Sequence, residues 1–191
     1  ARVYLEAPIV KDKLSITGSA RRTIVEPFLS VISQVAENNG GNTIGYNFYD
    51  LNGKLSWKIS DRDGIYLTGY NGRDAFSSGY SIDTNGVLDA LDFNLRWGNS
   101  AGILRWHRDW NQNLFSDFSI FSTRYQYNSI SRTESDFPTT PFQRNELTNN
   151  SEVRDLGARF NFEWLPRNRH FVRIGGTVVQ HQFVPEILQR Q

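Results

Sequence analysis

The sequence predicts an all-β protein: a segment of an antiparallel, up-and-down transmembrane β-barrel with about eight strands. Three observations predict it. Apolar and polar residues alternate along several segments, short turns alternate with long connections, and some of the predicted strands are long enough to cross a bilayer. We expect one barrel segment over residues 1–191, with hairpins at about 3–22, 46–73, 92–128 and 153–183.

The composition excludes several classes of protein. Lys and Arg number 21 and Asp and Glu number 20, a near-neutral balance that argues against a nucleic-acid partner. Cysteine is absent and only three histidines occur, which leaves little for a metal site. No apolar run approaches the ~20 residues of a membrane-spanning helix, whereas barrel strands need only alternate.

The clearest alternation runs over Tyr49–Ile59, and a second runs over Leu156–Trp164. Val172, Ile174 and Val178 give a third. In a barrel the apolar positions face lipid and the polar positions face the lumen. The predicted lipid-facing residues are Leu51, Leu55, Trp57, Leu156, Phe160, Phe162, Val172 and Ile174. The predicted lumen-facing residues are Asp50, Asn52, Lys54, Arg159, Asn161 and Glu163.

Short polar turns are predicted at four places: Val10–Asp12, Ser60–Asp63, Trp110–Asn113 and Pro166–Arg169. Each separates two strand-like segments and so forms a hairpin. A soluble sandwich has no reason to place short and long connections in strict alternation. A membrane barrel does, because its turns gather at one end and its loops at the other.

The long connections are predicted over Thr23–Ile44, Asp74–Leu91 and Ser131–Glu152, with a short helix within Ile24–Glu37. Loops on a rigid scaffold often carry function, so ligand capture is expected there. The candidate ligand residues in or directly beside these loops are Arg73, Phe76, Tyr80, Phe137 and Phe142.

Aromatic residues next to the short turns are typical of the girdles that border a membrane barrel. The candidates are Trp57, Trp106, Trp110, Phe115, Trp164 and Phe171. The apolar parity slips between Ile120 and Phe121, which is consistent with a β-bulge. This slip leaves open which face each side chain of segments 93–107 and 114–128 occupies.

Two further patterns contain residue types that occur in metal and catalytic sites. Asp61–Gly64 resembles half of a calcium loop but fits a hairpin turn better. His107, Asp109 and Ser116 contain the residue types of a hydrolytic triad, yet no glycine elbow accompanies them. We therefore expect no catalytic residue, no metal site and no cofactor.

Several motifs resemble, in order and spacing, the barrel of TonB-dependent receptors of the Bacteroidetes. They are Val3–Lys13 with its Ala-Pro-Ile and Lys-Asp-Lys, Ser19–Thr23 with Arg-Arg-Thr, Asp61–Leu67, Asn71–Asp74, Trp97–Ala101 and Leu104–Trp106. The likeness covers most of the chain, from Ala1 to about Phe183.

The resemblance implies a transporter for active nutrient uptake in the outer membrane of a Gram-negative bacterium, with short periplasmic turns and long extracellular loops. It implies outer-membrane lipid, a plug domain, further barrel strands, TonB and a surface lipoprotein lid as partners. The chain is then expected to be a piece of the barrel, since no plug precedes Ala1 and the end at Leu188–Gln191 lacks the usual aromatic residue.

Two alternatives stay open. Eight strands could close into a small outer-membrane barrel with a structural or adhesion role. A soluble β-barrel could instead bind an apolar ligand inside, with its polar positions facing water.

Overall fold

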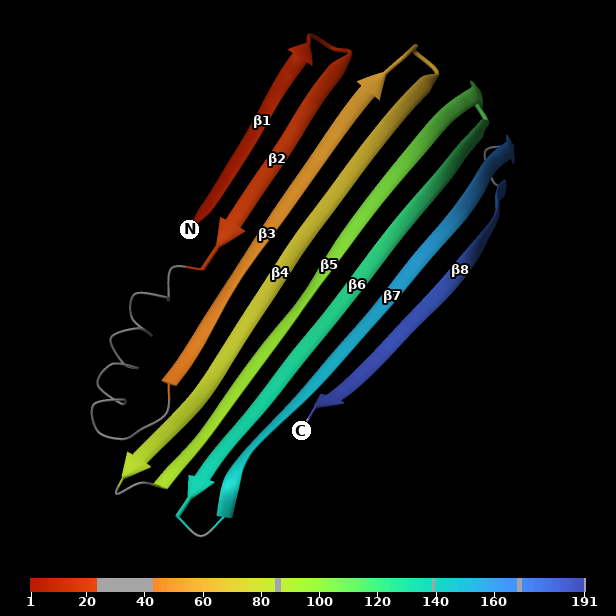
Figure 1. Ribbon diagram of the computed structural model, residues 1–191. Helices are drawn as coiled ribbons and strands as arrows, with labels where there is room; N and C mark the ends of the chain where they lie inside the picture. The colour runs from red at the N-terminus through yellow and green to blue at the C-terminus, as the bar shows by residue number, and fades with distance from the viewer. Residues whose placement is uncertain (24–42, 85–86, 139, 168–169, 191) are drawn as a thin grey trace.

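The computed structural model describes residues 1–23, 43–84, 87–138, 140–167 and 170–190. They form one eight-stranded antiparallel sheet in which each strand pairs with its neighbours in the chain (Figure 1). The strands are β1 (Arg2–Val10), β2 (Leu14–Arg22), β3 (Thr43–Lys58), β4 (Asp63–Thr84), β5 (Val87–Asn111), β6 (Leu114–Phe137), β7 (Thr140–Arg167) and β8 (His170–Arg190). The predicted all-β, up-and-down architecture is confirmed.

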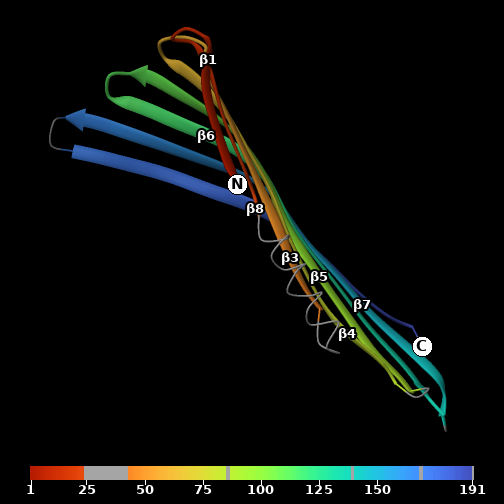
Figure 2. The same cartoon turned by 90° about the vertical axis from the view of Figure 1, so that its left-hand side faces the viewer.

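The sheet is a single twisted layer with two open edges (Figures 1 and 2). Strands β1 and β8 form these edges, and no pairing joins them within the described ranges. A closed eight-stranded barrel, one of the alternatives from the sequence, is therefore not the arrangement that these residues adopt.

Three of the short turns that the sequence predicts have local features that stabilise them. Asp12 adopts a left-handed backbone conformation (φ 60°) between β1 and β2, which aspartate tolerates better than most residues. Between β3 and β4, the Ser60 hydroxyl accepts hydrogen bonds from the backbone amides of Arg62 and Asp63 (3.1 and 3.0 Å). Between β5 and β6, the Asn111 side chain accepts one from the Asn113 amide (2.8 Å).

The predicted long loops differ most from the structure. β4 and β5 stay paired as far as Thr84 and Val87, so the segment predicted as the loop Asp74–Leu91 is the end of a hairpin. β6 and β7 likewise pair almost throughout the predicted loop Ser131–Glu152. The composition of these segments suggested loops, yet regular pairing continues through them. The predicted helix within 24–37 lies outside the described residues.

The predicted bulge at Ile120 and Phe121 is also wrong. These residues pair in unbroken register with Ala158 and Gly157 on β7. The parity slips because the Phe121 ring fills the space over Gly157, where an added Cβ would lie 2.3 Å from the ring. A large apolar side chain thus lies on the polar face because its neighbour has none.

The sheet has no apolar core of its own. Among the described residues, no hydrophobic side chain is buried, and many large ones are exposed. No helix in the described part of the chain is long and apolar enough to cross a membrane.

Candidate functional site: a two-faced wall

The strand register assigns every paired side chain to one of two faces, because directly opposed residues in antiparallel strands share a face. One such row runs from Leu55 through Leu67, Leu104 and Ile120 to Ala158. Its neighbours on the same face form what we call the apolar band: Val3, Leu5, Ala7, Leu14, Ile16, Leu51, Leu55, Trp57, Ile65, Leu67, Leu104, Trp106, Leu114, Phe118, Ile120, Leu156, Ala158, Phe160, Phe162, Trp164, Val172, Ile174 and Val178.

All eight residues predicted to face lipid lie in this band, and all six predicted to face the lumen lie on the opposite face. The register also assigns the faces that the sequence left open. Leu104 and Trp106 of β5 join the band, together with Phe118 and Ile120 of β6. What each face meets in the cell remains a prediction.

The apolar band runs obliquely to the strands. A row of directly paired residues runs perpendicular to the strands. One such row contains Val10, the last residue of β1, and reaches β7 at Phe160, well before that strand ends at Arg167. The band follows this stagger and stays close to the short turns on every hairpin. Strands that tilt against an apolar belt are typical of barrels.

Tryptophans mark the edge of the band near the turns. Trp57, Trp106 and Trp164 all lie on the band face, as the girdle prediction requires. Phe115 does not, because it pairs with Glu163 on the opposite face. Phe171 also lies opposite, where the Arg173 guanidinium covers its ring at 5.6 Å.

The face opposite the band carries polar pairs that link neighbouring strands. Asp50 accepts hydrogen bonds from Arg21 Nε (2.8 Å) and from the Tyr70 hydroxyl (2.9 Å). Arg173 Nε donates to Glu163 (2.9 Å), and Arg159 Nε donates to Thr177 (3.1 Å). These hydrogen bonds satisfy the polar groups of Asp50, Arg159 and Glu163, which are predicted to face the lumen, and they link neighbouring strands.

The other predicted lumen-facing residues contact rings and backbone. The Lys54 ammonium lies 5.7 Å from the centre of the Tyr66 ring. The Asn161 side chain occupies the space over Gly175, where a Cβ would lie 2.3 Å from its oxygen. Asn52 pairs with Ser19 and Tyr70 on the same face.

The triad considered from the sequence is not assembled. His107 Nε2 contacts Asp109 (2.9 Å) and its Nδ1 contacts Asp117 (3.2 Å), so carboxylates take both ring nitrogens. Ser116 lies on the other face and accepts a hydrogen bond from the Trp110 indole (2.9 Å).

Far from the short turns, the chemistry of the two faces inverts. The face that carries the polar pairs becomes aromatic there. We call this region the aromatic patch: Tyr46, Phe48, Phe76, Phe93, Trp97, Tyr125 and Tyr127. Phe76 and Phe93 lie with ring centres 6.3 Å apart, and the Arg21 guanidinium lies 4.9 Å from the centre of Phe48. Sequence reasoning named only Phe76 of this patch as a ligand candidate, because only the register aligns these side chains.

The Tyr46 hydroxyl in the patch donates a hydrogen bond to Asp74 (2.6 Å). This hydrogen bond raises the pKa of the Tyr46 phenol above its ordinary value. The Tyr46 ring lies beside that of Phe48, with the two ring centres 6.0 Å apart.

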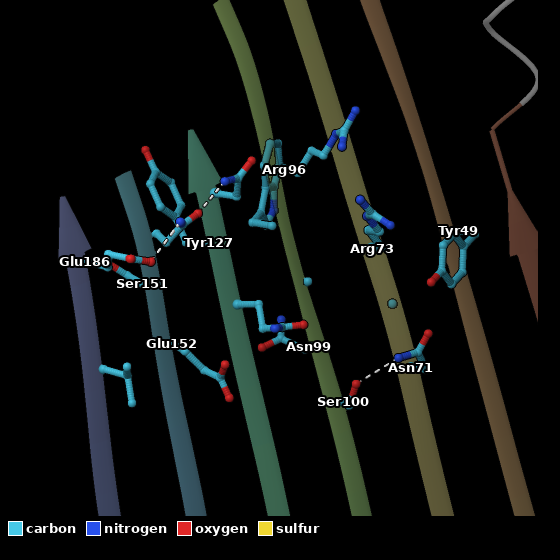
Figure 3. Close-up of a pocket in the computed structure, with 17 residues that line it drawn as sticks. Tyr49, Asn71, Arg73, Arg96, Asn99, Ser100, Tyr127, Ser151, Glu152 and Glu186 are labelled. Carbon is cyan, nitrogen blue, oxygen red and sulfur yellow. Dashed lines mark hydrogen bonds between the residues drawn. The ribbon is translucent and has the colours of Figure 1, made fainter. Parts of the chain in front are cut away.

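The band face becomes charged in the same region and is hollowed there (Figure 3). The hollow measures about 620 Å³ and its lining includes Tyr49, Asn71, Arg73, Arg96, Gly98, Ser100, Gln126, Asn150, Glu152 and Glu186. We call it the Gly98 hollow. At its β7 side, Arg124 holds Glu152 through two hydrogen bonds (2.6 and 2.9 Å), and Arg154 adds another. These bonds lower the pKa of Glu152 to about 2.

The predicted loop ligands are not brought together and do not lie in loops. Arg73 lies on β4 and lines the Gly98 hollow. Phe76 and Tyr80 lie on the opposite face of β4, where the Tyr80 hydroxyl donates to Asp89 (3.2 Å). Phe137 and Phe142 are exposed near the far end of the β6–β7 hairpin.

Searches against known proteins return no family model and no curated protein that matches this sequence. Among solved structures, the ferric preacinetobactin receptor of Acinetobacter baumannii aligns with a TM-score of 0.40 and 7% identity, over 93% of this chain and 36% of that one. The ferric yersiniabactin uptake receptor of Yersinia pestis gives 0.36 and 12%, over 98% and 40%. A siderophore receptor of A. baumannii gives 0.30 and 12%, over 97% and 37%.

The chain therefore has weak structural similarity to siderophore receptors and spans well under half the length of each. Their ligands belong to those proteins. None of these three structures comes from the Bacteroidetes.

Proposed function

We propose that this chain is part of the barrel wall of an outer-membrane receptor that imports a nutrient in a Gram-negative bacterium. The observation that carries the proposal is the oblique apolar band on one face of a single-layer sheet. Both the band and the ion-paired face opposite it are what a wall between lipid and an aqueous lumen requires.

The dimensions of the band support lipid as its environment. On β7 the band runs from Leu156 to Trp164, which matches the ~9–11 residues of a tilted membrane-spanning strand. Leu156 is 61% exposed and Val178 is 70% exposed. Apolar side chains this exposed need a cover, and hydrocarbon chains provide one along the whole band.

The two open edges support a larger wall. Lipid offers no hydrogen bonds, so the free backbone groups of β1 and β8 need neighbouring strands. We propose that these strands belong to the rest of the same receptor, which would also supply a plug. Transport driven by TonB, the Bacteroidetes type and a surface lipoprotein lid are finer proposals that rest on the sequence motifs alone.

The aromatic patch is the proposed ligand surface of this receptor. It lies on the lumen-facing side, beyond the polar pairs and away from the short turns. Its rings offer flat apolar area, and Asp74 and Arg21 offer charge beside them. The substrate is unidentified, and no catalytic step is proposed.

The test is the size and location of the native protein. An antibody raised against residues 131–152 is used to probe the soluble fraction and boiled and unboiled outer-membrane fractions on a gel. We expect a band several times heavier than a 191-residue chain, whose mobility changes on boiling. A heat-modifiable band at the mass of a 191-residue chain would favour the small closed barrel instead. A band only in the soluble fraction would exclude both membrane proposals.

A further inference from the structure

The Gly98 hollow is lined by Gly98, which has no side chain, and by a rim of polar side chains that includes Arg73, Arg96 and Ser100. An added Cβ on Gly98 would lie 2.7 Å from the Gly72 carbonyl oxygen, so only glycine fits where β4 and β5 approach this closely. Arg73 lies opposite Gly98 on β4 and Gln126 lies opposite it on β6. Arg96 and Ser100 flank it on its own strand, and Figure 3 labels both side chains.

The charges on this rim are available to a ligand. Within the described part of the chain, Arg73 and Arg96 form no ion pair, and both are exposed. The Ser100 hydroxyl accepts a hydrogen bond from the Asn71 amide (2.8 Å), which leaves its own proton free to donate. The lining also contains two carboxylates: Glu152 on β7, which Arg124 and Arg154 neutralise, and Glu186 on β8, which accepts a hydrogen bond from Asn150 (3.1 Å). On the β4 and β5 side of the hollow, two guanidinium groups and a hydroxyl lie around Gly98 and suit a phosphate group.

A second hollow of about 550 Å³ lies on the same face, nearer the short turns. Its lining is apolar and includes Leu104, Trp106, Ile120, Phe160 and Val178. Gly102 lies between the two hollows on β5, with no atom within 4 Å of where its Cβ would be. From Gly98 to Leu104 the strand covers about 20 Å at ~3.4 Å per residue, and no side chain of Gly102 blocks the way.

We propose that a phosphate-bearing membrane lipid binds along β5, on the outer surface of the wall. Its phosphate lies in the Gly98 hollow between Arg73 and Arg96, and an acyl chain crosses Gly102 into the apolar hollow. The proposal rests on the proposed function, which turns this face toward lipid. Cationic side chains directly beyond an apolar belt are placed where lipid headgroups lie.

The experiment is native mass spectrometry of the whole receptor, purified in detergent, with added lipids. Wild-type protein should retain one phosphatidylglycerol at least tenfold more tightly than diacylglycerol with the same acyl chains. The double variant Arg73→Gln, Arg96→Gln should lose this preference. The control is Arg132→Gln, Arg144→Gln, which removes equal charge from the same face; because these arginines pair with Glu146 and Glu134, the control should keep the preference.

Two further arms identify the source of the phosphate. Gly102→Leu fills the path between the hollows, so it should weaken binding of phosphatidylglycerol and leave binding of inorganic phosphate unchanged. Equal affinity for inorganic phosphate and for phosphatidylglycerol would overturn the lipid assignment. So would wild-type protein that does not distinguish phosphatidylglycerol from diacylglycerol, or a control that loses the preference as fully as the double variant.

The outcome separates from that of the proposed function. A heat-modifiable membrane band for both wild type and the double variant, without any lipid preference in the wild type, rejects only the lipid site. A wild-type protein absent from the membrane rejects the proposed function first.

Discussion

The end of the sheet near the short turns and the far end carry opposite chemistry on the same face. Near the turns, Leu55 and Phe160 belong to an apolar face, and Asp50 to a face of ion pairs. Far from the turns, Arg96 lies on the face of the band, and Trp97 on the other. A soluble barrel would keep one face apolar along its whole length. The inversion is expected of a wall that is embedded in lipid at one end and surrounded by water at the other.

The largest effect on stability is expected when a charge is placed on each face of β3 in turn. Leu55→Arg inserts a charge into the apolar band and should lower the free energy of unfolding by about 2–4 kcal/mol if the band faces lipid. Asn52→Arg, three residues away on the opposite face, should change it by less than ~1 kcal/mol. Urea unfolding of the whole receptor, refolded into lipid vesicles, measures both. Equal losses for the two variants would contradict the facing assignment.

A smaller effect is expected from two glycines of β5, one in each region. Gly98→Ala drives a methyl group against the Gly72 carbonyl and should cost about 1–3 kcal/mol, because backbone must shift. Gly102→Ala meets open space and should be neutral or slightly stabilising, since alanine loses less backbone entropy than glycine. The same unfolding assay compares the variants. A harmless Gly98→Ala would mean that β4 and β5 are not held this close at the far end.

The smallest effect concerns pH and the charged far end. The pKa of Glu152 is lowered to about 2, chiefly by its hydrogen bonds to Arg124 and then by those to Arg154. A carboxylate with a lowered pKa stabilises the fold above its ordinary pKa, near 4.5, and this contribution disappears as the pH falls toward about 2. Thermal unfolding should therefore separate wild type from Glu152→Gln by a small, constant margin between pH 7 and 5.

That margin should shrink as the pH is lowered from about 4.5 to 2. Lys58→Gln provides a comparison at the other end of the sheet, where the Lys58 ammonium pairs with Asp61 in the turn (2.7 Å). A Glu152→Gln margin that does not change with pH would show that the ion pair with Arg124 contributes nothing to stability.

The sequence predicted the strands near the turns because their period is two and one face must be apolar. Leu51, Leu55 and Trp57 needed only their spacing to be assigned to one face. Phe121 could not be assigned this way, because the space that it fills is created by Gly157 on another strand.

Sequence patterns also did not predict the strands at the far end of the sheet. Ser, Asn and Gly in segments such as Asp74–Leu91 are typical of loops, yet pairing between β4 and β5 overrides that local preference. Arg73 was a candidate for ligand binding, but its companions Arg96 and Gly98 become neighbours only through the register of two strands.

Pairing between chain neighbours alone has a consequence for how the sheet forms. Each strand meets the next one along the chain, from β1 to β8, without any crossover. Closing each pair therefore involves only two strands and the connection between them, even where the paired residues are far apart in the sequence, as Glu146 and Arg190 are. A sheet of this topology can form from successive pairs of strands, without inserting a strand between two that are already paired.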